Sequence, residues 1–183
     1  MRLFIASSFD PAFTDGLKLV SSYARDNAGR DTVKWVDPSN FHITYAFLGD
    51  MADPAAARKG LDAGLEGAPA FNISLGSFGV FPSARHPSVL WVGIGEGTAE
   101  LRELARKLSE GLAAAGLVFE ERFEPHVTLG RVKGVLPENF VRRVSDYSQG
   151  RRALSRLASV ELMESRLTRE GPEYRQVYSK KLL

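Results

Sequence analysis

The chain has 183 residues, of which 44% are hydrophobic and 25% charged, a composition typical of a globular protein with one domain or two small ones. It contains no cysteine, which excludes disulfides, thiol nucleophiles and cysteine-ligated zinc. The opening apolar run, residues 3–6, is too short for the core of a signal peptide, and no run approaches the roughly 20 apolar residues of a membrane span. We therefore expect a cytoplasmic protein without a membrane partner.

Hydrophobic periodicity and turn residues divide the first half of the chain into alternating strands and helices. Apolar residues at spacings of three and four, from Phe13 to Ala24, predict a helix that begins at Pro11. A second helix is predicted from Asp53-Pro54 onward. Strands are predicted at residues 2–9, 33–36, 41–49, 70–81 and 88–94.

The second half of the chain repeats this order of elements. A helix is predicted from Thr98, as its N-cap, to Gly116, and another from Pro137. Strands are predicted at residues 117–120, 125–132, 159–168 and 173–179.

A repeat in which His126 and Thr128 follow His42 and Thr44 by 84 residues indicates an internal duplication. We expect an α+β fold in which residues 1–183 form one bilobal domain. Its two pseudo-twofold-related lobes would each be an antiparallel sheet with helices packed outside, and the active-site cleft would lie between them. Coincidence among common βα patterns is the alternative, and the shared His-x-Thr argues against it.

The net charge is only +2, but it is unevenly distributed: residues 1–92 carry −1 and residues 93–183 carry +3. Two interpretations stay open for the basic cluster of the second half, a solvated surface and a face that attracts phosphates. The cluster comprises Arg142, Arg143, Arg151, Arg152 and Arg156.

Two segments, FHITYAFLGD and EPHVTLGRVK, place His-x-Thr inside an apolar, strand-like run. Residues i and i+2 of a strand point to the same face, so His42 shares a face with Thr44, and His126 with Thr128. A single histidine on a strand usually has a structural role. Two matched pairs related by a pseudo-twofold axis instead predict one site with two imidazoles and two hydroxyls.

Such a set of side chains suits phosphoryl chemistry. Imidazole titrates near pH 6.5, so that one ring can act as general base while the other, protonated, acts as general acid. Two threonine hydroxyls can donate hydrogen bonds to phosphate oxygens as negative charge develops on them. The same set supports displacement at phosphorus without a metal ion.

Neither motif carries the ligands of a metal or nucleotide cofactor. A carboxylate pair, which a magnesium site would need, is absent from both, and a zinc site would need a third ligand. The remaining histidine, His86, lies in a turn between two prolines and is interpreted as a surface residue. We therefore predict no metal and no cofactor.

The two motifs resemble the signature motifs of the two-histidine (2H) phosphoesterases, and most closely the RNA 2′,3′-cyclic phosphodiesterases, also called 2′-5′ RNA ligases or LigT-like proteins. A single His-x-Thr is a weak signal, whereas the doubled motif with its flanking residues is a specific one. The resemblance extends over the whole chain through RLFIA near the start, Trp35-Val36, VLWVGI, ERFEPHVTLGR and the segment from Gly171 to Tyr174.

The resemblance implies a metal-free enzyme that opens a 2′,3′-cyclic phosphate on RNA and leaves a 2′-phosphate. It implies that His42 protonates the leaving 3′ oxygen and that His126 activates water. It also implies that Thr44 and Thr128 bind the phosphate. Some members of the family also join or cleave 2′-5′ linkages in tRNA halves without ATP.

The resemblance further associates Arg131 with the active site. Strict alternation places Arg131 on the face opposite to His126, so it reaches the site only if the strand ends or bulges near Gly130. The sequence departs from the family pattern at Tyr45-Ala46, where leucine and a longer polar residue are frequent, and at Gly130, where alanine is common.

Two alternatives to RNA cyclic-phosphate hydrolysis stay open. One is a phosphodiesterase for another small cyclic nucleotide or for a cyclic phosphate of ADP-ribose. The other is a nucleotide- or RNA-binding module without turnover, against which the intact histidines and threonines argue, because binding alone needs no titratable pair. The expected partner is RNA with a 2′,3′-cyclic phosphate end, tRNA halves included, or a small cyclic nucleotide, bound by a monomer.

Overall fold

The computed structural model describes residues 1–120 and 122–183 of the chain. Its helices are α1 (Pro11–Asn27), α2 (Ala55–Gly64), α3 (Thr98–Ala114) and α4 (Phe140–Gln149), with a short 3-10 helix at Pro38–Asn40. Its strands are β1 (Arg2–Ser7), β2 (Val33–Trp35), β3 (Ile43–Asp50), β4 (Phe71–Pro82), β5 (Pro87–Ile94), β6 (His126–Val132), β7 (Leu154–Leu157), β8 (Ser159–Leu167) and β9 (Pro172–Lys181).

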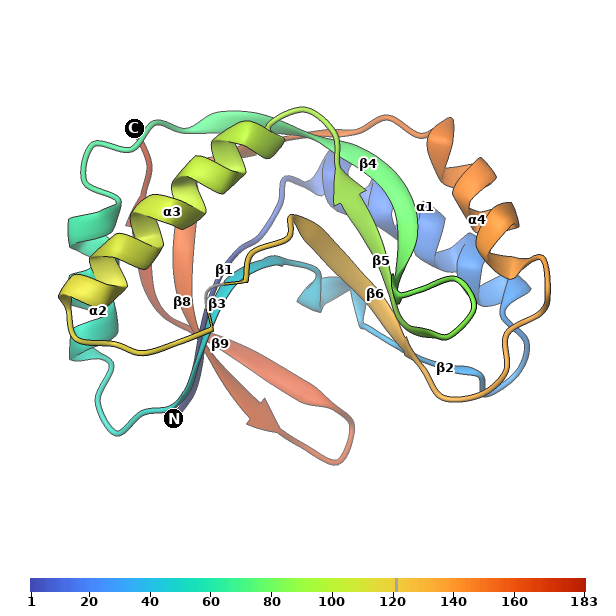
Figure 1. Cartoon of the computed structure of the whole chain (residues 1–183), viewed down its shortest axis with the longest axis horizontal. Coiled ribbons are helices and arrows are strands. Elements are labelled where there is room, and N and C mark those ends of the chain that lie inside the picture. The colour runs from blue at the N-terminus through green and yellow to red at the C-terminus, as the bar shows by residue number, and fades with distance from the viewer. Residues whose placement is uncertain (121) are drawn as a thin grey trace.

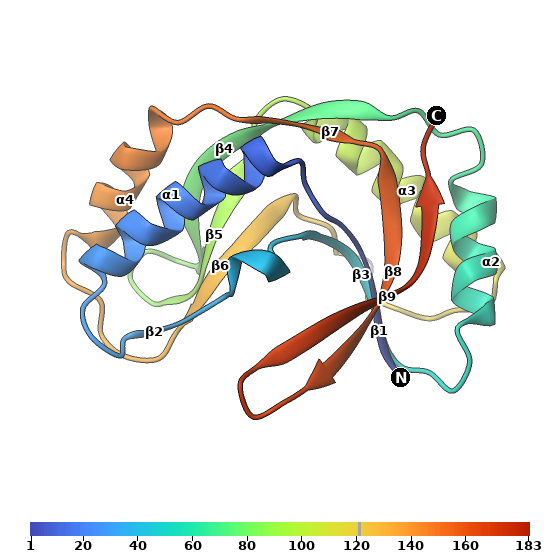
Figure 2. The ribbon, with the colours of Figure 1, turned by 180° about the vertical axis from the view of Figure 1, so that it is seen from behind.

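The strands form one curled antiparallel sheet in the order β7-β4-β5-β6-β3-β1-β8-β9, and the short β2 pairs with the free side of β6 (Figure 1). The two histidine strands, β3 and β6, meet in the middle of this order through the pair Ile43 and Val127. From this junction three more strands follow on either side. β8 and β9 also extend as a hairpin that projects from the rest of the molecule (Figure 2).

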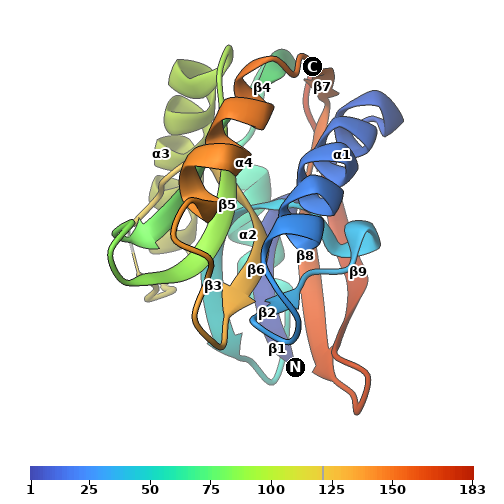
Figure 3. The ribbon, with the colours of Figure 1, turned by 90° about the vertical axis from the view of Figure 1, so that its right-hand side faces the viewer.

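The helices pack in two pairs, one at each end of the molecule. α2 and α3 lie together at one end, and α1 and α4 at the other (Figures 1 and 3). The α2–α3 contact depends on glycine, because a Cβ at Gly111 would lie 2.3 Å from the carbonyl oxygen of Gly60. Each helix buries an apolar stripe against the sheet, as its periodicity predicts.

The helices cover one face of the sheet, and the cross-strand register identifies which. Phe78 pairs with Val92, which pairs with Val127, so these three buried side chains share a face. Phe140 of α4 meets Phe78 on that face, with an edge-on ring contact of 6.1 Å. The residues on either side of Val127 therefore point to the other face, away from the helices.

The predicted α+β class, with antiparallel strands and helices packed on the outside, is confirmed. The predicted separate sheets are instead one continuous sheet, since β3 and β6 hydrogen-bond to each other. The internal duplication with its 84-residue offset stays a prediction. Among the described residues, no helix has the length and apolar content needed to cross a membrane.

Three local predictions were wrong. Residues 117–120 do not form a strand, and β7 was not predicted. Thr98 is the first residue of α3, and the N-cap is Gly97, whose left-handed φ of 87° suits glycine. The Thr98 hydroxyl donates back to the carbonyls of Ile94 and Gly95, which competes with a capping role.

Candidate active site

The two His-x-Thr pairs lie at the junction of β3 and β6, on the face that the helices leave open. Because Ile43 is paired with Val127, antiparallel geometry places His42 opposite Thr128 and Thr44 opposite His126. Directly opposite residues have Cβ atoms roughly 4.5–5.5 Å apart. The fold thus brings the two predicted histidines and the two predicted threonines together as one polar group.

Both imidazoles are held in the same way. The Nδ1 atom of His42 lies 2.5 Å from the carbonyl oxygen of Asn40, and that of His126 lies 2.6 Å from the carbonyl oxygen of Glu124. A carbonyl only accepts hydrogen bonds, so each Nδ1 carries the proton and donates. In the neutral ring this leaves Nε2 as an unprotonated acceptor, and in the charged ring as a donor.

Aromatic side chains support both rings, a feature that the sequence analysis did not assign. His42 packs against Phe4 and Tyr174, with ring centroids 5.2 and 5.3 Å away. His126 packs edge-on against Phe81 at 5.3 Å, and more distantly against Trp91. In the sequence, Phe4 of β1 and Trp91 of β5 lie at corresponding places in their strands. Their role could be recognised only once β1 was known to pair with β3, and β5 with β6.

The environment of His42 favours its neutral form. Burial lowers the pKa of His42, the hydrogen bond to Asn40 raises it, and the charge of His126 lowers it further, with a net decrease from the ordinary value. The effect of His126 on this pKa also shows that the two rings are within electrostatic reach of each other. A positive charge on His126 therefore disfavours protonation of His42.

Arg131 lies on the same face as the two His-x-Thr pairs, because β6 contains a bulge. Trp91 of β5 pairs with Thr128, whereas Val89, two residues away on the same face of β5, pairs with Arg131. The register shift between them leaves Leu129 as the extra residue of β6. The condition for Arg131 to reach the site, a bulge near Gly130, is therefore met.

The charge of Arg131 also affects the pKa of Tyr174, which packs against His42. Burial raises the pKa of Tyr174, and the guanidinium of Arg131 acts against this increase. Tyr174 packs against His42, which immediately precedes β3. Arg131 of β6 thus influences the surroundings of the histidine on the other side of the junction.

Gly130, one of the departures from the family pattern, permits β2 to pair closely with β6. A Cβ at Gly130 would lie 2.6 Å from Cγ1 of Val33 and 3.2 Å from Cε3 of Trp35. The other departure, Tyr45, is buried and donates its hydroxyl to Oγ of Ser7 at 3.0 Å. Both positions therefore have a role in packing, Gly130 by leaving room for β2 and Tyr45 by its hydrogen bond to Ser7.

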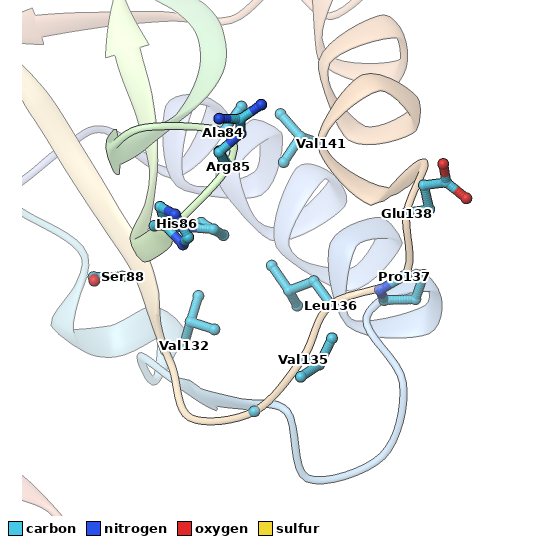
Figure 4. A pocket seen from close by; sticks show the side chains of 12 residues that line it. Ala84, Arg85, His86, Ser88, Val132, Val135, Leu136, Pro137, Glu138 and Val141 are labelled. Carbon is cyan, nitrogen blue, oxygen red and sulfur yellow. The ribbon is translucent and has the colours of Figure 1, made fainter.

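Two cavities among the described residues lie away from His42 and His126. One, of about 480 Å³, is lined by the turn at 84–88, the loop at 134–138 and Val141 (Figure 4), and the other, of about 570 Å³, by residues that include Arg25 and Trp35. No predicted site residue lines either cavity, so the predicted cleft between the lobes stays a prediction. His86, in the turn at 84–88, is an exposed residue, as predicted.

The chemistry of the donor set gives no support for a metal site. Within residues 1–120 and 122–183, no three His, Cys, Asp or Glu side chains gather closely enough to hold a metal ion. The carbonyls of Asn40 and Glu124 hold the Nδ1 atoms, which leaves one nitrogen on each ring to act on a ligand.

Comparison with known proteins places the chain in a family. The family model of the 2′-5′ RNA ligase superfamily matches residues 24–166. The chain is 38% identical over 154 residues to an RNA 2′,3′-cyclic phosphodiesterase of Aeropyrum pernix, covering 81% of this chain and 86% of that protein. It is 34% identical over 179 residues to an RNA 2′,3′-cyclic phosphodiesterase of Archaeoglobus fulgidus, covering 97% and 98%.

Solved structures show the same fold over the whole chain. The crystal structure of E. coli LigT complexed with 3′-AMP superposes with a TM-score of 0.72 and 22% identity, covering 99% of this chain and 97% of LigT. A Thermus thermophilus protein superposes with a TM-score of 0.74 and 24% identity, covering 100% and 98%.

The chain therefore belongs to the 2′-5′ RNA ligase superfamily of two-histidine phosphoesterases. The predicted family is confirmed, and with it the prediction that the chain is an enzyme.

Proposed function

We propose that this protein hydrolyses 2′,3′-cyclic phosphodiester ends of RNA to 2′-phosphomonoesters, by general acid–base catalysis with two histidines and without a metal ion. His42 is the general acid and His126 the general base. Thr44, Thr128 and Arg131 bind the phosphate. The names of the relatives support the reaction, and the paired geometry of the two motifs supports the mechanism.

The observation that carries the mechanism is the matched pair of Nδ1 hydrogen bonds. Each ring is fixed through one nitrogen to a backbone carbonyl two residues earlier, so each presents the other nitrogen, Nε2, for proton transfer. A binding module would need only donors. A pair of oriented, titratable nitrogens opposite two hydroxyls is what a displacement at phosphorus requires.

In the proposed reaction, Nε2 of neutral His126 accepts a proton from water, and the water oxygen forms a bond to phosphorus. The bond between phosphorus and the 3′ oxygen breaks on the opposite side, and Nε2 of protonated His42 gives its proton to that oxygen. The hydroxyls of Thr44 and Thr128 donate to the remaining phosphate oxygens, whose negative charge they stabilise. Arg131 contributes a fixed positive charge from the same face.

The lowered pKa of His42 fits this scheme once substrate binds. In the free protein, burial disfavours the charged ring. The negative charge of a bound phosphodiester favours the imidazolium and opposes that effect, so His42 gains its proton together with the substrate. With the 5′-hydroxyl of a second RNA in place of water, the same groups would form a 2′-5′ linkage.

The second candidate substrate is a small cyclic nucleotide, because the same four side chains serve any five-membered cyclic phosphate. The names of the relatives favour RNA. The two candidates differ in how the rate depends on the length of the nucleic acid.

Turnover of a short oligoribonucleotide that ends in a 2′,3′-cyclic phosphate tests the proposal. We expect a 2′-phosphate product at an unchanged rate in EDTA. A product with a 3′-phosphate would contradict the assigned leaving group. Loss of activity in EDTA, restored by a divalent ion, would contradict metal independence, and comparison with 2′,3′-cyclic AMP would show whether RNA is preferred.

A further inference from the structure

RNA that ends in the reacting phosphate must leave the site in one direction, and two are available on the open face. One runs outward along β6, and the other along β3. At the 84-residue offset, Arg131 of β6 and Lys133, the residue after its end, correspond to Phe47 and Gly49 of β3. The two directions therefore differ in charge, although the histidines between them are alike.

The β6 direction carries three cations on one face. Lys34 of β2 is the direct partner of Arg131, and cross-strand partners project to the same side. The ladder continues for one more bond, from the N–H of Lys133 to the carbonyl of Thr32 at 2.7 Å, so Lys133 follows Arg131 on that face. All three side chains belong to exposed residues, and within the described parts of the chain none of them forms an ion pair with an acid.

The β3 direction carries less positive charge, namely Arg2 of the neighbouring β1. Phe47, the counterpart of Arg131, is 69% exposed, and Gly49, the counterpart of Lys133, has no side chain. β3 then ends at Asp50, an acid whose cross-strand partner on β1 is Arg2 and whose charge offsets that cation. A polyanion would gain more attraction along β6, where three cations lie, than along β3, where one cation faces one acid.

We propose that the RNA strand leaves the active site along β6, with its phosphates in contact with Arg131, Lys34 and Lys133. We call the three residues Arg131, Lys34 and Lys133 the β6 track. The inference rests on the proposed function for the identity of the ligand, and it assigns to Lys34 and Lys133 a role in holding RNA longer than one nucleotide. Gly130 serves the track as well, because it permits the approach of the strand that carries Lys34.

The geometry also separates the track from the basic cluster of the second half. Arg142 and Arg143 lie on α4, which packs on the helix-covered face of the sheet, opposite to the histidines. They are exposed cations of the same chain that an RNA on the open face does not reach. They therefore provide a charge-matched control.

The experiment is the binding of a fluorescent ten-nucleotide RNA ending in a 2′-phosphate, measured by anisotropy between 50 and 200 mM salt. We expect Lys34→Ala with Lys133→Ala to weaken binding roughly tenfold at low salt and to flatten the slope of log affinity against log salt by about 1.4, that is, about 0.7 for each single-strand phosphate contact. Arg142→Ala with Arg143→Ala should leave both quantities unchanged. Hydrolysis of 2′,3′-cyclic AMP, which does not extend to the track, should be unchanged in both double variants.

Equal weakening of RNA binding in the two double variants, or no weakening in the Lys34/Lys133 variant, would contradict the proposed role of the β6 track. If only the α4 variant loses affinity, the RNA lies on the helix side. The result is separable from the proposed reaction: wild-type protein that binds the RNA through the track but hydrolyses neither the cyclic oligonucleotide nor cyclic AMP would refute the reaction and leave the track in place. Circular dichroism of each variant checks that the fold is retained.

Discussion

Strands β3 and β6 meet at one residue pair, and near that pair they are alike. Each carries His-x-Thr, each histidine donates Nδ1–H to a carbonyl two residues earlier, and each strand bulges one residue after its threonine, at Tyr45 and at Leu129. Two residues beyond the bulge they diverge, with Phe47 on one strand and Arg131 on the other. In the proposed reaction the matched residues do the chemistry, and we propose that the residues that differ orient the substrate.

The bulge in each strand explains how the same strand can carry both the matched His-x-Thr pair and a residue that differs between the strands. Without the two bulges, the alternation of side chains along a strand would place Arg131 and Phe47 on the helix-covered face. The extra residue in each strand returns Arg131 and Phe47 to the open face beside the histidines. In the proposed function Arg131 attracts phosphate there, whereas Phe47 offers an aromatic surface. A change that removes a matched feature should therefore abolish turnover, whereas a change in an unmatched feature should alter only how the substrate is held.

The largest expected effect is the loss of either histidine. His42→Ala and His126→Ala should each lower the turnover of a cyclic-phosphate oligonucleotide roughly 10²–10⁴-fold, since each removes one proton transfer. The double variant should be little slower than either single one, because residues that act as a unit are not additive. Full activity in either single variant would refute the two-histidine mechanism.

The threonines should be equivalent to each other and weaker than the histidines. Thr44→Ala and Thr128→Ala each remove one hydrogen bond to a charged oxygen, on the order of 1.5–3 kcal/mol, so each should lower kcat/KM by roughly 10- to 150-fold. Serine at either position, which keeps the hydroxyl, should restore most of the activity. A variant that loses activity with serine as well as with alanine would show that the methyl packing matters and not the hydroxyl.

A third prediction concerns Gly130 and its counterpart Ala46, at which the two strands differ by one methyl group. Gly130→Ala should lower the free energy of unfolding by about 1–3 kcal/mol, because the added Cβ would lie 2.6 Å from Val33 and must displace β2. Ala46→Gly should lower it by only about 0.5–1 kcal/mol, the cost of a glycine in a strand. Urea denaturation measures both, and equal losses would contradict the close approach of β2.

The smallest expected effect is a change in the pKa of His42. Burial and the charge of His126 lower this pKa, so an NMR titration of the free protein should place it below the ordinary value near 6.5. His126→Ala removes one of the two lowering effects and should raise the pKa of His42 back toward that value. Because His42 must be protonated as the acid, kcat/KM of the wild type should fall as pH rises through the lowered pKa. An unchanged pKa in the variant would show that the rings are not coupled.

The sequence predicted the repeated parts of the molecule better than the parts that pair across it. The His-x-Thr faces, the helices and the hairpin strands followed from local spacing. The aromatic supports Phe4 and Trp91 and the partner Lys34 could not be assigned, because their roles depend on which strands pair. The bulge at Leu129 was recognised only as a condition, since a register shift depends on both strands. Residues 117–120 have strand-like composition but no partner strand to pair with.

The proposed mechanism gives the two matched histidines opposite roles, His42 as acid and His126 as base. A nucleotide phosphodiester with a p-nitrophenolate leaving group tests it most directly, because such a group departs without a proton. We predict that His42→Ala recovers most of the wild-type rate on this substrate, and that His126→Ala stays slow because water still has to be activated. Recovery of His126→Ala and not of His42→Ala would contradict the account by reversing the two roles.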